Sequence, residues 1–193
     1  MSLLKDNFLE LVERIKLGIE FAHASFEPIF YLVFSPEEIL AVKRYMPGWK
    51  SKLTNSGWDV HEFSIATAIQ EIFDEMPAFI KKTWEMQDAK SPLNWQKTNH
   101  ALAEALINKN KLQHKLESVL SQLEGQPNSM LLVTDIEALH PYLRIGSIES
   151  QLQGKFHVPT IFFYPGVRTG RTRLKFLGFY PEDGNYRSVH VGG

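Results

Sequence analysis

The chain has 193 residues, a length that fits one globular domain spanning residues 1–193. Of these residues 44% are hydrophobic and 22% charged, a composition that excludes a disordered chain, a collagen-like repeat and a coiled-coil rod. It contains no cysteine, which excludes disulfide scaffolds, thiolate zinc sites, iron–sulfur clusters and cysteine nucleophiles. A net charge of −1 excludes a generic binder of polyanions, so any contact with nucleic acid has to come from a local patch.

Residues 3–21 are predicted to form an amphipathic helix, because Leu4, Phe8, Leu11 and Ile15 recur at helical spacing. The charged residues between them leave no apolar core for a signal peptide. The longest unbroken apolar run, residues 29–34, is far shorter than the roughly 20 residues that a membrane helix needs. We therefore expect a cytoplasmic protein that does not enter a membrane.

Strands and helices are expected to alternate through the rest of the chain. The predicted strands are residues 29–34, 58–63, 130–136 and 158–166. The predicted helices are residues 36–46, 64–86, 95–123 and 136–152, with a loop at residues 88–94. Ser35 is a natural N-cap, Pro47-Gly48 is expected to interrupt the helix that follows it, and Pro77 and Pro141 are expected to kink or split theirs. Residues 174–180 and 186–191 are predicted strands joined by a turn at residues 181–185.

This order of elements predicts an α/β fold with three layers: a mostly parallel sheet flanked by helices, with an antiparallel C-terminal hairpin extending one edge. The order also suits nucleotide enzymes, but the loop after the first strand, residues 34–38, has no Gly or Lys and carries two carboxylates. The third strand leads into Asp135, as in the metal-holding strand of such ATPases, although an N-cap is the commoner use of such an Asp. We therefore expect a degenerate relative of the P-loop NTPase fold that does not hydrolyse ATP.

No constellation of catalytic residues is visible. The seven histidines form no HxxxH or HxH pair, and Ser147 has only half of a nucleophile-elbow motif. Asp59 and His61 share one strand face, which is a minimal hint of acid–base chemistry and is equally typical of a solvated strand end. We predict no catalytic, cofactor-binding or metal-binding residue, no cofactor, no enzymatic activity and no small-molecule ligand.

The strongest local anomaly is a basic loop between the fourth and fifth predicted strands. From Tyr164 to the end the chain carries a formal charge of +3, whereas the rest carries −4. Four residues of this loop are candidates for binding a partner or a phosphate: Arg168, Arg171, Arg173 and Lys175. Arginine forms bidentate hydrogen bonds with carboxylates and phosphates alike, so the loop suits an acidic protein face or a nucleic-acid backbone. A solvated connection between strands is the alternative interpretation.

The tail also resembles a known family. The segments Phe163-Tyr164-Pro165-Gly166, 174–178 and Asn185-Tyr186-Arg187 resemble the BrxB family of bacteriophage-exclusion (BREX) systems, formerly a domain of unknown function. The resemblance extends over essentially the whole chain, with only a general match in the middle helices. It implies a small, non-enzymatic component of an antiviral defence complex that acts beside a large ATPase and a phosphatase-like PglZ protein. It implies no catalytic residues.

Two functions from different classes remain open at this point. The favoured one is an adaptor that binds partner proteins of the defence complex. The alternative is a nucleic-acid-contacting module that uses the basic loop.

Overall fold

A seven-stranded sheet lies at the centre of the computed structural model, which describes residues 3–20, 27–170, 173–184 and 188–193. Five strands run parallel in the order β2-β3-β4-β1-β7. Their bounds are Ile29–Phe34 (β1), Asp59–Ser64 (β2), Ser129–Thr134 (β3), Thr160–Arg168 (β4) and Val189–Gly192 (β7). The short strands β5 (Arg173–Phe176) and β6 (Glu182–Gly184) continue from β4 in antiparallel fashion.

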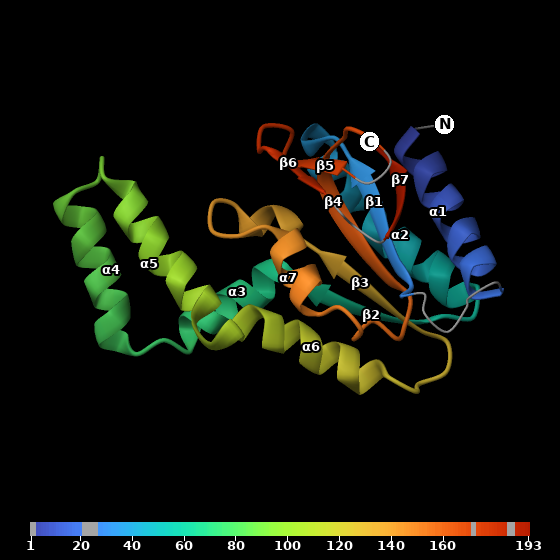
Figure 1. Cartoon of the computed structure of the whole chain (residues 1–193), viewed down its shortest axis with the longest axis horizontal. Coiled ribbons are helices and arrows are strands. Elements are labelled where there is room, and N and C mark those ends of the chain that lie inside the picture. The colour runs from blue at the N-terminus through green and yellow to red at the C-terminus, as the bar shows by residue number, and fades with distance from the viewer. Residues whose placement is uncertain (1–2, 21–26, 171–172, 185–187) are drawn as a thin grey trace.

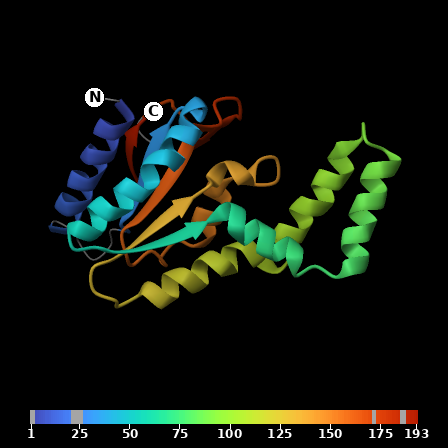
Figure 2. The same ribbon diagram turned by 180° about the vertical axis from the view of Figure 1, so that it is seen from behind.

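Helices cover both faces of this sheet, as the sequence predicts. On one face lie α1 (Leu3–Glu20) and α2 (Ile39–Asn55), in front of the strands in Figure 2. The other face is covered by α3 (Ile65–Asp74), α6 (Lys111–Leu123) and α7 (Ile145–Gln151), with α6 and α7 nearest the viewer in Figure 1. Because strand residues alternate between faces, Tyr31 and Val33 pack in one core and Phe30 and Leu32 in the other. The predicted three-layered α/β fold is confirmed.

Two further helices, α4 (Ala78–Lys90) and α5 (Trp95–Ile107), extend away from the layers. Figures 1 and 2 both show them at the end of the molecule opposite α1. Three short 3-10 helices complete the secondary structure of the described residues: η1 (Pro36–Glu38), η2 (Asn108–Asn110) and η3 (Ile136–Leu139). No helix in this described part of the chain is long and apolar enough to cross a membrane.

The predicted helix breaks are confirmed at two positions and wrong at two others. Pro77 and Pro141 interrupt the helical segments, as predicted, since α3 and α4 are separate and η3 precedes α7. Pro47 does not interrupt its helix: α2 continues to Asn55, because Trp49 and Leu53 beyond the proline are buried against the sheet. The single helix predicted over residues 95–123 is wrong as well. Lys109 and Asn110 adopt left-handed φ angles of 56° and 53° and separate α5 from α6.

The C-terminal strands pair differently from the prediction. Residues 174–180 and 186–191 were expected to pair with each other, but β5 pairs with β4, and β7 runs parallel to β1. Val191 on β7 is buried in the core under α1, which accounts for this strand's place beside β1. A Cβ atom at Gly166 would lie 2.3 Å from the Lys175 carbonyl oxygen, so the close approach of β5 to β4 requires this glycine.

Candidate functional site

Polar side chains meet where β2 and β3 end. Ser64 Oγ donates a hydrogen bond to Asp135 Oδ2 at 2.6 Å. The Lys43 Nζ atom, on α2, lies 2.7 Å from Asp135 Oδ1 and 2.9 Å from Glu137 Oε1. We call Lys43, Ser64, Asp135 and Glu137 the edge cluster. Open parallel sheets bind ligands outside the carboxyl ends of their strands, and the edge cluster lies at this end of β2 and β3.

The charges of the edge cluster stabilise one another. Burial alone would raise the pKa of Asp135, but hydrogen bonds from Lys43 and Ser64 outweigh it, so the pKa lies below its usual range. The hydrogen bond to Asp135 raises the pKa of Lys43, with Glu137 acting in the same direction. Lys43 and Asp135 therefore remain ionised and paired with each other at neutral pH.

Asp135 only partly meets its predicted role. It occupies the N-cap position of η3, with a left-handed φ of 56°, but its side chain does not bond to the backbone of that helix. The carboxylate is directed instead to Lys43 and Ser64. Among the described residues no group of three or more His, Asp or Glu side chains is placed to hold a metal ion.

The loop after β1 caps the N-terminus of η1 with its own side chains. The Ser35 side chain accepts from the Glu37 backbone N–H at 3.4 Å, and the Glu38 side chain accepts from the Ser35 N–H at 3.2 Å. This is a capping box, as expected from Ser35 as an N-cap. Backbone donors that a phosphate loop would direct at its ligand are bonded here to Ser35 and Glu38.

A cleft of about 520 Å³ opens between α2 and the edge cluster. Phe34, Val42 and Phe163 form part of its apolar wall. Glu62 accepts from Thr134 Oγ1 at 3.0 Å and pairs with Lys50 at 2.8 Å. Each carboxylate that lines this cleft has a partner within the chain.

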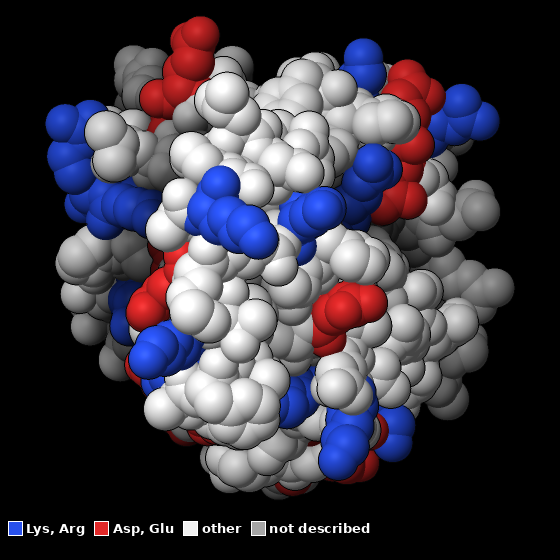
Figure 3. All heavy atoms as spheres, turned by 90° about the vertical axis from the view of Figure 1, so that its left-hand side faces the viewer, with Lys and Arg blue, Asp and Glu red and all other residues white. Residues whose placement is uncertain are grey.

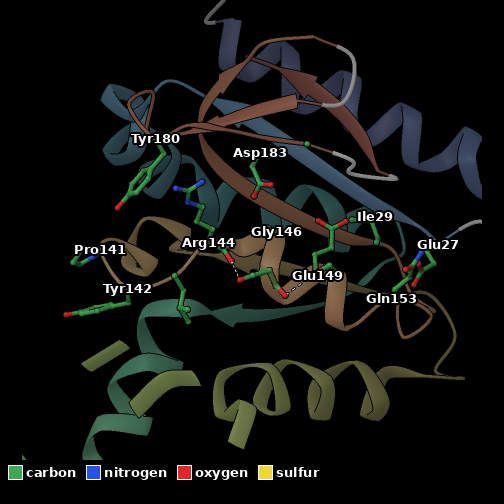
Figure 4. Close-up of a pocket in the computed structure, with 14 residues that line it drawn as sticks. Glu27, Ile29, Pro141, Tyr142, Arg144, Gly146, Glu149, Gln153, Tyr180 and Asp183 are labelled. Carbon is green, nitrogen blue, oxygen red and sulfur yellow. Dashed lines mark hydrogen bonds between the residues drawn. The ribbon is translucent and has the colours of Figure 1, made fainter. Parts of the chain in front are cut away.

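A second cleft, of about 920 Å³, lies beside α7. Figure 4 shows Glu149 reaching into it from α7 and Asp183 from β6. Glu149 is only 8% exposed and accepts a hydrogen bond from the Tyr31 hydroxyl. Burial raises its pKa to about 7, against the effect of the Tyr31 hydrogen bond, and the charges of Glu27 and Asp183 add to the rise. At the opposite wall the Arg144 guanidinium lies 4.9 Å from the centre of the Tyr180 ring.

Glu149 is a functional candidate that no motif marks, but the spacing of its helix contains a signal. Ile145, Ile148, Glu149 and Leu152 follow the i, i+3, i+4, i+7 spacing of a buried helix face, and all four are buried. A carboxyl on such a face is rarely buried unless it is bonded, which makes it worth singling out. Its partner Tyr31 could not be found in this way, since it lies 118 residues away in sequence.

The basic loop is partly engaged within the chain. Arg168 is half-buried and donates to the Gly170 carbonyl at 2.8 Å and the His190 carbonyl at 3.4 Å. Arg173, which is exposed, lies 3.4 Å from Glu182 on β6. Lys175 is half-buried on β5, while Arg171 lies outside the described residues. Arg168 is the last residue of β4, and Arg173 and Lys175 lie on β5. Because Arg168 pairs with Leu174, its side chain lies on the opposite face of this antiparallel pair from Arg173 and Lys175.

The remaining sequence candidates lie apart from both clefts or do not form a reactive set. His61 Nε2 and Asp59 Oδ2 are 2.8 Å apart on the surface of β2, as the solvated-strand interpretation expects. Ser147 Oγ donates to the Arg144 carbonyl at 2.7 Å, so its hydroxyl is engaged within the first turn of α7. His23 and the segment Asn185-Tyr186-Arg187 lie outside the described residues.

Comparison with known proteins gives one match. The family model described as "BREX protein BrxB" matches residues 61–191, which extend from β2 into β7. This match confirms the resemblance that the sequence analysis drew from the tail. The chain matches no curated protein and no solved structure.

Proposed function

Since this chain belongs to the BrxB family of BREX proteins, we propose that it is a non-enzymatic adaptor that binds other proteins of a BREX defence system. The family makes it a component of such a system, and other BREX proteins are its natural partners. The large ATPase and the PglZ-like protein that the resemblance implies are the first candidates. The cytoplasm is the proposed location.

The edge cluster is the observation that carries this proposal. Lys43 and Asp135 pair at 2.7 Å at the point where a nucleotide enzyme would expose phosphate-binding groups. Releasing the lysine for a phosphate would leave the Asp135 and Glu137 carboxylates without their cation next to an anion, which is electrostatically unfavourable. The fold then serves as a scaffold in the manner of a degenerate P-loop protein, and the surface carries the function.

A nucleic-acid-contacting role is the second candidate, because Arg168 at the end of β4 and Arg173 and Lys175 on β5 bring three basic residues to the paired ends of these strands. Their engagement within the chain weakens this candidate. Arg168 donates to two carbonyls, and Arg173 pairs with Glu182, so a phosphate would compete with existing bonds.

One experiment separates the two candidates. The tagged chain is co-expressed with the other proteins of its BREX operon and captured, and the purified chain is titrated with duplex DNA at two salt concentrations. The adaptor proposal expects at least one BREX protein to be captured and DNA binding to be negligible.

Replacing Arg168, Arg171 and Arg173 together with Ala tests the basic loop in both assays. DNA binding through three phosphate contacts would follow salt with a log–log slope of roughly −2 to −3 and would vanish in this variant. DNA binding of that kind without capture of any BREX protein would refute the adaptor proposal.

A further inference from the structure

The hairpin of α4 and α5, which we call the arm (residues 78–107), is weakly integrated into the fold. No side chain of α4 is buried, and its main neighbour is α5. Between the two helices lies a hollow of about 720 Å³, lined in part by Ile80, Trp84 and Ile107. A 13-residue helix is marginal by itself in water, so α4 receives little of the packing that usually stabilises a helix.

The arm nevertheless exposes large apolar side chains. Phe79 is 69% exposed and Met86 is 56% exposed, and a spacing of seven residues places them on one side of α4. At the tip, where α4 turns into α5, Leu93 is 93% exposed and Trp95 52%. Exposed apolar side chains that gather on one side of a helix and at its tip form a candidate interaction surface.

The side of α4 that carries Phe79 and Met86 is also basic. Counting from Phe79, Lys82 is at i+3, Thr83 at i+4, Met86 at i+7 and Lys90 at i+11, and all five side chains are exposed. We call these five residues the α4 stripe. Asp88 lies on the opposite side of the helix, whereas Glu85, three residues after Lys82, borders the stripe, so the stripe has two lysines and one carboxylate at its edge. Figure 3, which views the molecule from the arm's end, shows basic side chains on a largely uncharged surface, with some acidic side chains among them.

These charges select the occupant. A second copy docked stripe to stripe would place the lysines of both copies in one interface, where like charges disfavour the pairing. A segment with apolar side chains flanked by carboxylates would cover Phe79 and Met86 and pair with both lysines. We propose that the α4 stripe docks such an acidic, amphipathic segment of another protein. This inference rests on the proposed function, since the adaptor's BREX partner supplies the segment.

The test uses the full chain, co-expressed and captured with the other proteins of its BREX operon. The double variant Phe79→Glu/Met86→Glu is expected to lower capture of the partner at least about tenfold, because losing a central apolar anchor commonly has such an effect. Lys82→Glu/Lys90→Glu is expected to lower it as well, and the wild-type complex is expected to weaken with salt. The matched controls are Leu40→Glu, which charges an apolar residue of α2 that is 71% exposed, and Lys81→Glu on the opposite flank of α4. Both controls are expected to capture the partner normally.

Four outcomes would overturn the proposal. Equal capture by wild type and Phe79→Glu/Met86→Glu would remove the docking site and leave the adaptor proposal standing, whereas no capture by wild type would remove both. A dimer in sedimentation that Phe79→Glu abolishes would make a second copy the occupant. Duplex DNA bound through Lys82 and Lys90 would assign the stripe to nucleic acid. Circular dichroism of each variant confirms that the fold is retained, and Lys82→Glu/Lys90→Glu, which alters only exposed charges, keeps the test valid if the double apolar variant unfolds.

Discussion

Replacing Glu149 with Gln is expected to change how the stability of the protein depends on pH. The carboxyl is 8% exposed, and burial raises its pKa in the folded chain to about 7, from an ordinary value of 4.5. Tyr31 donates a hydrogen bond that favours the ionised form, while Glu27 and Asp183 oppose ionisation by their charge. Desolvation therefore dominates at this position.

The sign follows from the two pKa values. Because the folded protein holds the proton more tightly than the unfolded chain, the free energy of unfolding falls as the pH rises from about 4.5 to about 7. The difference between the two values corresponds to roughly 3 kcal/mol, and the loss is complete above the folded pKa. Gln keeps an oxygen that accepts from Tyr31 and stays neutral at every pH, so the variant avoids this loss.

Urea unfolding of wild type and Glu149→Gln between pH 4.5 and 8.5 measures the effect. The two proteins should be about equally stable at the acid end, and the variant should be more stable at pH 8 by up to roughly 3 kcal/mol. His190 contributes with the opposite sign in both proteins, so it cancels in their difference. Glu85→Gln, which makes the same substitution at an exposed carboxyl, serves as the control. A difference between wild type and Glu149→Gln that does not vary with pH would refute the argument.

Three further predictions concern buried groups and the edge cluster. Burial and the charge of Arg168 lower the pKa of His190 to about 4, so NMR signals of its ring should not titrate between pH 8 and 5.5; a midpoint near 6.5 would contradict this. Leu132→Ala and Phe162→Ala each truncate a fully buried strand residue and should each cost about 2–5 kcal/mol in urea unfolding, whereas neutral effects would mean that the core is misassigned. Purified protein should neither hydrolyse ATP nor gain thermal stability from it, and turnover that Asp135→Ala abolishes would refute the scaffold role of the edge cluster.

The sequence predicted the central strands well because each is a short apolar run between turn residues. β1 matches its prediction at both ends, and β3 and β4 differ by one or two residues. Local patterns could not predict that the helix continues past Pro47, because the packing of Trp49 and Leu53 against the sheet keeps it intact. Local patterns could not predict the pairing of residues 189–192 with β1 either, since it joins segments about 160 residues apart in sequence.

Of the candidate sites, those formed by neighbouring residues could be predicted, and those assembled from distant segments could not. The basic loop was visible as a local concentration of charge, whereas the edge cluster joins Lys43, Ser64 and Asp135 from three separate elements. Only Asp135 could be singled out beforehand, as the residue after a buried strand. Lys43, the ion-pair partner of Asp135, could not be predicted from the sequence, because the two residues meet only where α2 packs over the sheet.

An adaptor that joins two proteins needs two surfaces that can be occupied at once, and the fold offers them on separate elements. The arm lies between β2 and β3 in the chain, and the basic loop between β4 and β5. Figure 1 shows the arm and the β5 extension well separated on the molecule. Neither surface belongs to the parallel core, so changes to one should leave the core and the other surface intact. If both dock partners, the α4-stripe variant and the Arg168/Arg171/Arg173 variant should each lose a different BREX protein, and the combined variant should lose both. Loss of the same protein from either variant would instead describe one extended interface.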